Sequence, residues 1–105
     1  MSNELICGTE CKLKITLPEI DGSTQYEYNF DVEIYVNPKK KLTINRDFCF
    51  PIEGQPSKFI VPFDTADVGV GELNVEMVIY VPDDYFADKL RTERVRVESV
   101  TTIIP

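Results

Sequence analysis

The sequence predicts an all-β fold, an antiparallel β-sandwich of immunoglobulin-like or jelly-roll-like type with about six to eight strands. Apolar and polar residues alternate along four segments, and short stretches rich in Gly, Pro, Asn and Asp separate these segments. Alternation with period two turns one strand face toward a core, whereas a helix requires spacing of three and four. No strand–helix alternation is present, so a parallel sheet is not expected. The length of 105 residues predicts a single domain, residues 1–105.

The first two alternating segments are residues 12–17 (KLKITL) and 26–36 (YEYNFDVEIYV). Their inward faces are expected to hold Leu13, Ile15, Leu17, Tyr26, Tyr28, Phe30, Val32, Ile34 and Val36. Their outward faces are expected to hold Lys12, Lys14, Thr16, Glu27, Asn29, Asp31, Glu33 and Tyr35. The dipeptide Asp21-Gly22 between the segments predicts a hairpin that joins them.

The other two alternating segments are residues 58–63 (KFIVPF) and 72–81 (ELNVEMVIYV). Their inward faces are expected to hold Phe59, Val61, Phe63, Leu73, Val75, Met77, Ile79 and Val81. Pro62 predicts an edge strand or a bulge, because proline has no amide donor for a neighbouring strand. Segments 26–36 and 72–81 are long and free of proline, so they are predicted to be central strands.

The connecting stretches carry turn signals. Residues 37–41 and 53–57 predict loops. Residues 64–71 (DTADVGVG) predict a short helical turn with Asp64 or Thr65 as its cap, followed by glycines that admit positive φ. Residues 82–93 predict an irregular stretch with one turn capped by Asp83 or Asp84, before the chain re-enters a strand at 94–97 (RVRV).

The charge and hydropathy of the chain exclude several classes of partner. The net charge is −7, from 11 basic and 18 acidic residues, which argues against nucleic acid and against an anionic membrane surface. The sequence shows neither a signal peptide nor a run of about 18 apolar residues that could span a membrane. We expect the charge mainly to confer solubility, and a cationic partner stays open as an alternative.

The residues of common active sites are largely missing. The chain contains no histidine, and no serine occurs in a G-x-S-x-G context. Cys7 and Cys11 form a C-x3-C pair, but only Cys49 is left to add to it, and zinc requires four ligands. We therefore expect free thiols, a buried Cys49, and no enzyme activity, cofactor or bound metal. A small metal-binding or hydrolytic domain is the least favoured alternative.

Five residues make up the candidate interaction surface: Tyr35, Val78, Tyr80, Ile103 and Ile104. Tyr35 and Tyr80 point to the polar faces of their strands, and on neighbouring strands their rings could stack on a sugar or on a protein. Val78 occupies a face that ought to be polar. Val100, Ile103 and Ile104 make the last strand apolar on both sides, so it is either the buried centre of the sandwich or is covered by a partner.

Residues 59–99, FIVPFDTADVGVGELNVEMVIYVPDDYFADKLRTERVRVES, resemble the closing half of small β-sandwich domains in the tail proteins of bacteriophages and prophages. They are most similar to the N-terminal domain of the baseplate upper protein family. The resemblance implies a non-enzymatic structural or attachment subunit of a virion, in the tail, baseplate or fibre anchor. Its partners would be other virion proteins and copies of itself in a homo-oligomer, and it would be assembled in the bacterial cytoplasm. A carbohydrate-binding β-sandwich module is the alternative.

Overall fold

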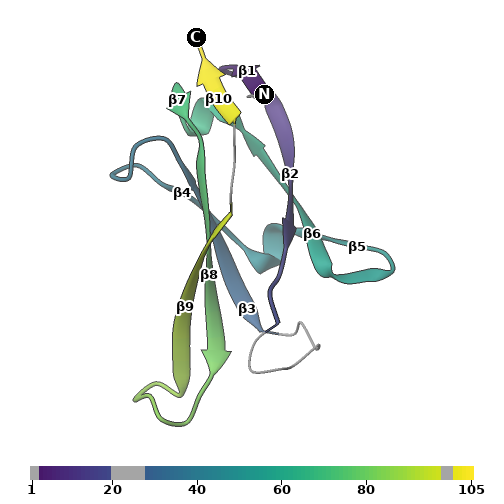
Figure 1. Cartoon of the computed structure of the whole chain (residues 1–105), viewed down its shortest axis with the longest axis vertical. Coiled ribbons are helices and arrows are strands. Elements are labelled where there is room, and N and C mark those ends of the chain that lie inside the picture. The colour runs from purple at the N-terminus through teal and green to yellow at the C-terminus, as the bar shows by residue number, and fades with distance from the viewer. Residues whose placement is uncertain (1–2, 20–27, 98–100) are drawn as a thin grey trace.

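Two β-sheets pack face to face, and a third, smaller sheet lies at the end where the two termini meet (Figure 1). The computed structural model describes residues 3–19, 28–97 and 101–105. The large sheet has the order β4 (Leu42–Asn45), β3 (Asn29–Tyr35), β8 (Asn74–Pro82) and β9 (Leu90–Val97). The second sheet has the order β2 (Glu10–Thr16), β6 (Gln55–Asp64) and β5 (Phe50–Ile52). The end sheet has the order β1 (Asn3–Ile6), β10 (Thr101–Ile104) and β7 (Gly71–Glu72).

The all-β prediction is confirmed, but the ten strands of the described residues exceed the expected six to eight. The additional strands are short: β1, β4, β5, β7 and β10 have only two to four residues each. A strand of that length shows too few residues for period two to be recognised. The described residues contain two 3-10 turns, η1 (Arg46–Phe48) and η2 (Thr65–Asp67), and no α-helix.

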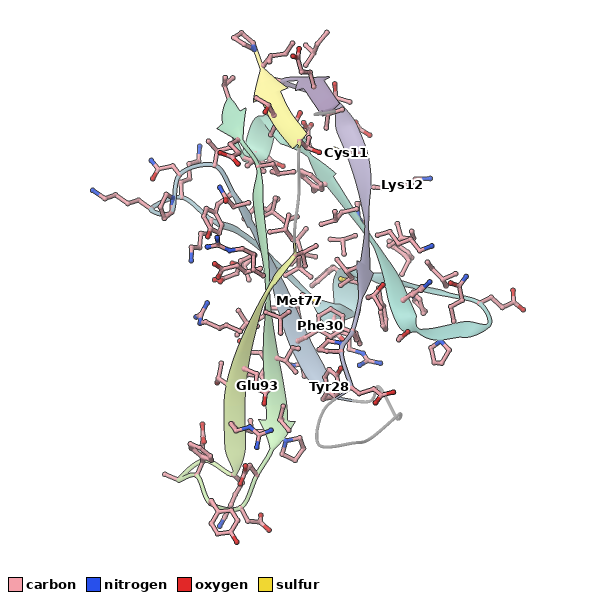
Figure 2. The ribbon with its side chains drawn as sticks, in the orientation of Figure 1. Cys11, Lys12, Tyr28, Phe30, Met77 and Glu93 are labelled. Carbon is pink, nitrogen blue, oxygen red and sulfur yellow. The ribbon has the colours of Figure 1, made fainter. Side chains whose placement is uncertain are left out.

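The core lies between the large sheet and the second sheet, as the alternation predicts. The predicted inward residues that are buried there are Ile15, Leu17, Phe30, Val32, Ile34, Phe59, Val61, Phe63, Leu73, Val75, Met77, Ile79 and Val81. Phe30 of the large sheet meets Phe59 of the second sheet edge to face, with ring centroids 5.3 Å apart. Figure 2 shows Phe30 and Met77 between the two sheets.

The two central strands are placed as predicted, because β3 lies between β4 and β8, and β8 lies between β3 and β9. The predicted hairpin between the first two long segments is wrong. β2 pairs with β6 in the second sheet, whereas β3 belongs to the large sheet. Each strand has a full apolar face, so placing them in opposite layers buries both faces against each other. Asp21 and Gly22 themselves lie outside the described residues, as does Tyr26.

One pair of strands is parallel, contrary to the expectation from the sequence. β1 pairs with β10 in parallel, from Asn3 beside Thr101 to Ile6 beside Ile104. A parallel pair needs a long connection, and here almost the whole chain separates the two strands. A pairing between segments so far apart in the sequence cannot be predicted from local sequence patterns.

The turn chemistry agrees in part with the sequence. The Asp64 side chain caps η2 by accepting a hydrogen bond from the Ala66 amide at 2.9 Å. Asp83 accepts from the Tyr85 amide at 3.0 Å, but this is a turn without a helix, and β9 already begins at Leu90. The strand in this region therefore begins at Leu90 and not at Arg94, where the sequence predicts it.

Loop 53–57 is shorter than predicted, because only Glu53 and Gly54 separate β5 from β6. Gly54 has φ +76°, which glycine adopts without strain. Pro62 of β6 pairs with β2, while the β5 partners of β6 end at Ile60. The nitrogen of Pro62, which has no hydrogen to donate, therefore belongs to a stretch of β6 that has no β5 partner, as expected of an edge position.

Thr65 joins the turn after β1 to the start of η2 through hydrogen bonds. It is completely buried. Its Oγ1 accepts a hydrogen bond from the Gly8 amide at 2.9 Å and donates one to the Thr9 carbonyl oxygen, also at 2.9 Å. The Thr65 amide donates to the same Thr9 carbonyl at 3.1 Å. One side chain thus satisfies backbone groups that lie more than 50 residues away in the sequence.

Gly71 occupies a position where any side chain would be strained and would displace a neighbour. Its φ is +136°, and a Cβ built there would lie 2.5 Å from a Val36 methyl group. Gly69 also has a positive φ, +102°, but an added Cβ would meet nothing within 4 Å. Glycine is therefore favoured at Gly71 both by its positive φ and by its close approach to Val36, whereas at Gly69 it is favoured by the positive φ alone.

We expect Thr65→Val to lower the free energy of unfolding by about 1–3 kcal/mol, because the Gly8 amide loses its acceptor while the side-chain volume is kept. Thr65→Ser keeps the hydroxyl and should cost no more than about 1 kcal/mol for the lost methyl group. Urea unfolding followed by circular dichroism measures both. Equal stability of the wild type and Thr65→Val would contradict the role assigned to this hydroxyl.

Gly71→Ala should cost more than Gly69→Ala, by about 1–3 kcal/mol, because it adds a clash with Val36 to the backbone strain. Val36→Ala in the same chain should recover part of that loss. A double-mutant cycle on unfolding free energies measures this coupling. If the effects of Gly71→Ala and Val36→Ala simply add, the close approach does not control the stability of this turn.

Candidate interaction surface

The outer face of the large sheet carries three of the candidate residues, Tyr35, Val78 and Tyr80. Its strands pair so that side chains stand in rows across the sheet. One row contains Asp31, Val78 and Arg94, with Asn45 of β4 beside Asp31. The next row contains Thr43, Glu33, Glu76 and Arg96.

Two acidic residues face each other at the centre of this surface. Glu33 and Glu76 are direct cross-strand partners, a placement that is unfavourable for like charges. Cations from both flanks compensate: Arg94 lies 2.9 Å from Glu33 and 3.7 Å from Glu76, and Lys41 lies 3.7 Å from Glu33. Arg96 lies 3.9 Å from Glu76. The face is thus held together by its own ion pairs.

Both candidate tyrosines are bound within the same face. The Tyr80 hydroxyl donates to Asp31 at 2.6 Å, and the Tyr35 hydroxyl donates to Glu76 at 3.0 Å. Each bond to a carboxylate favours the protonated phenol and, with burial, raises the pKa of the tyrosine above its usual value. The Lys41 ammonium lies 4.8 Å from the centroid of the Tyr35 ring. Neither hydroxyl can donate a hydrogen bond to a ligand without breaking its bond to the sheet.

Val78 is only 5% exposed, although no second layer of the described residues lies over this face. Its cross-strand partners are Asp31 and Arg94, and Tyr80 lies two residues along its own strand. Asp31 is held by Tyr80, and Arg94 is held by Glu33. We conclude that these engaged polar side chains cover Val78, so its burial requires no partner.

The two tyrosines do not form a joint platform. β3 and β8 are neighbours, but they run in opposite directions, so Tyr35 pairs with Asn74 while Tyr80 pairs with Asn29. This register sets the two residues six positions apart along the sheet, roughly 20 Å at the usual rise per strand residue. A sugar stacked on one ring would not reach the other.

The last two candidate residues belong to the end sheet. Ile103 is fully buried in the main core, whereas Ile104 is partly exposed beside Ile6. Ile6 is 64% exposed on the edge strand of this sheet. The last strand is therefore buried through one of its faces only, and Val100 lies outside the described residues.

A second surface escaped the sequence analysis, the outer face of the second sheet. Phe50 pairs with Ile60, and Ile60 pairs with Lys14 on its other side. Pro62 and Lys12 form the adjacent pair. Phe50 is 61% exposed, and Figure 2 shows Lys12 pointing away from the large sheet. We call the set Lys12, Lys14, Phe50, Lys58, Ile60 and Pro62 the lysine face.

A signal for this face was present in the sequence. In the FCFP stretch, Cys49 has an extended backbone after η1, so burying its side chain turns the side chain of Phe50, the first residue of β5, outward. Cys49 is buried as predicted, and both phenylalanines are exposed. The signal was missed because β5 is only three residues long.

The loop between β8 and β9 is the other exposed apolar feature. Tyr85 is 98% exposed, and Phe86 and Leu90 are also exposed. Backbone hydrogen bonds hold the loop: the Asp83 amide donates to Lys89 at 2.9 Å, and the Lys89 amide donates to Phe86 at 2.9 Å. Figure 1 shows the loop at the opposite end of the molecule from the two termini. We call residues 83–90 the aromatic loop.

The cysteines do not form a reactive site. All three are free, and burial raises the pKa values of Cys11 and Cys49. The Asp64 carboxylate adds to the shift at Cys11. Protonated thiols are weak nucleophiles and weak metal ligands. A search of residues 3–19, 28–97 and 101–105 finds no group of three or more Cys, Asp and Glu side chains placed to hold a metal ion.

A shallow hollow of about 430 Å³ lies at the β2–β6 pair, lined by Glu10, Cys11, Lys12, Pro62, Phe63 and Asp64. In the part of the chain that the structure describes, no helix has both the length and the apolar character needed to cross a membrane.

Comparisons with protein-family models, with curated proteins and with solved structures found no match for this chain.

The tyrosine hydrogen bonds predict a pH dependence. Because the folded-state pKa of Tyr80 lies above the ordinary value of 10.0, the stabilisation is fully present below about pH 10 and is lost as pH rises through the folded pKa. The unfolding free energy of the wild type should therefore fall as the pH rises above about 10.

Tyr80→Phe and the double variant with Tyr35→Phe should show a smaller fall over that range. Urea titrations at several pH values measure the slopes. A slope in the double variant equal to that of the wild type would show that these hydroxyls are not bonded to carboxylates in solution.

Proposed function

We propose that this chain is a non-enzymatic structural or attachment subunit of a bacteriophage or prophage particle. It acts by protein–protein association, with copies of itself and with other virion proteins. The supporting observation is that large apolar side chains stand exposed, among them Phe50 of the lysine face and Tyr85, Phe86 and Leu90 of the aromatic loop. Contiguous exposed apolar surface is typical of association sites in proteins that work in assemblies.

The distribution of polar partners supports the same assignment. Charged groups on the outer face of the large sheet are paired with one another. The lysine face instead combines Phe50, Ile60 and Pro62 with lysines. A surface whose groups are already paired gains little by docking, whereas unpaired charge beside apolar area favours it.

The choice of a virion part rests on the likeness of residues 59–99 to the small β-sandwich domains of phage tail proteins. The residues that carry this likeness form β6, η2, β7, β8 and β9. They span the strands that build both sheets and also the aromatic loop. Particles of this kind are built from repeated copies of small subunits, which fits association through exposed β-surface.

Association is tested by measuring the mass of the purified protein across micromolar to millimolar concentrations, by light scattering and native mass spectrometry. We expect the average mass to rise with concentration above that of a monomer. A monomer at every concentration would contradict self-assembly.

The virion assignment is tested separately by the neighbourhood of the gene. Genes for tail, portal or fibre proteins on either side are expected. A neighbourhood of metabolic genes would contradict a virion part, whatever the oligomeric state.

A further inference from the structure

The lysine face combines three cations with apolar area, and the acidic pair Glu10 and Asp64 continues the same outer face beyond Lys12 and Pro62. No described residue forms an ion pair with Lys12, Lys14 or Lys58. On the large sheet, by contrast, Lys41 and Arg94 are both engaged by Glu33. Unpaired lysines are notable on a chain of net charge −7.

The aromatic loop has the opposite character. It presents Tyr85 and Phe86 between two exposed acidic residues, Asp84 and Asp88. The loop contains three Asp and one Lys, a net charge of −2. An aromatic pair flanked by carboxylates complements a surface of Phe50, Ile60 and Pro62 flanked by lysines.

The base of the loop is fixed before any contact is made. Arg91 binds Asp83 at 2.9 Å and Glu93 at 3.0 Å. Lys89 closes the loop in the left-handed conformation, with φ +63°. A loop that is already ordered loses less conformational freedom on docking.

The loop and the face are different patches of one molecule. The loop projects from β8 and β9 of the large sheet, beyond the end of the sandwich (Figure 1). The lysine face is directed away from the large sheet (Figure 2). A contact between them therefore joins two copies.

We propose that the aromatic loop of one copy docks on the lysine face of a second copy. Tyr85 and Phe86 cover Phe50, Ile60 and Pro62, and Asp84 and Asp88 pair with Lys12 and Lys14. The contact joins two unlike patches, so the bound pair still presents one free loop, on one copy, and one free face, on the other. Such a contact builds a ring or a filament and does not stop at a symmetric dimer.

The interface is small. Two aromatic side chains bury about 150–250 Å² each, which places the contact among weak, concentration-dependent interfaces. Its charged rim makes it sensitive to salt. This inference rests on the proposed function, since it specifies how the copies associate.

Two variants test the contact, each disabling one patch. The face variant carries Lys12→Glu and Lys14→Glu, and the loop variant carries Asp84→Ser and Tyr85→Ser. All four side chains are exposed, so folding is expected to be kept and is checked by thermal melting. The matched control carries Lys39→Glu and Lys40→Glu, which reverses two exposed lysines in the loop before β4.

Sedimentation velocity then measures assembly of the wild type and of each variant. We expect each patch variant to associate more than about tenfold more weakly than the wild type, and the control to assemble like the wild type. An equimolar mixture of the face and loop variants should form a one-to-one dimer and grow no further, because only one intact loop and one intact face remain.

Three outcomes separate the claims. If the wild type assembles and the patch variants assemble equally well, association uses another surface, and this contact is wrong while the proposed function stands. If both patch variants are monomeric and their mixture is monomeric too, the two patches do not bind each other. A wild type that stays monomeric at every concentration overturns the proposed function together with this contact.

Discussion

On the outer face of the large sheet, the register of β3 with β8 sets the carboxylates of Glu33 and Glu76 side by side, and the rest of the sheet is arranged around that pair. The same register turns the apolar residues of both strands into the core, and a slip of one residue would exchange the two faces. Arg94 comes from β9 and Lys41 from the segment before β4, so neutralising the acidic pair also fastens the flanking strands. Core packing and surface charge therefore select one strand alignment.

This arrangement has a consequence for function. The hydrophobic position on the outer face, Val78, is covered by side chains that are engaged in the same network. This face therefore needs no partner to cover Val78. Exposed apolar area lies instead on the second sheet and in the loop between β8 and β9, where Phe50 and Tyr85 contact solvent. Association through these two places is compatible with an intact large sheet.

The long alternating segments predicted the class of fold, the inward residues and the central position of β3 and β8, because period two is a local property. Pairings between distant segments could not be predicted, and the parallel pairing of β1 with β10 is the clearest case. The burial of Val78 by its neighbours also could not be predicted from the sequence, since it depends on which residues of β3 and β9 pair with it. The exposure of Phe50 could have been predicted from the burial of the preceding Cys49, but β5 is too short to be recognised as a strand.

The central claim is that copies of this chain bind each other through the lysine face and the aromatic loop, while the outer face of the large sheet takes no part in the contact. Two-dimensional amide NMR spectra recorded over rising protein concentration test it most directly. Resonances of Lys14, Ile60 and residues 84–86 should shift and broaden as the concentration rises, and those of β3 should stay constant. Shifts confined to Tyr35, Val78 and their neighbours on the large sheet would contradict the account.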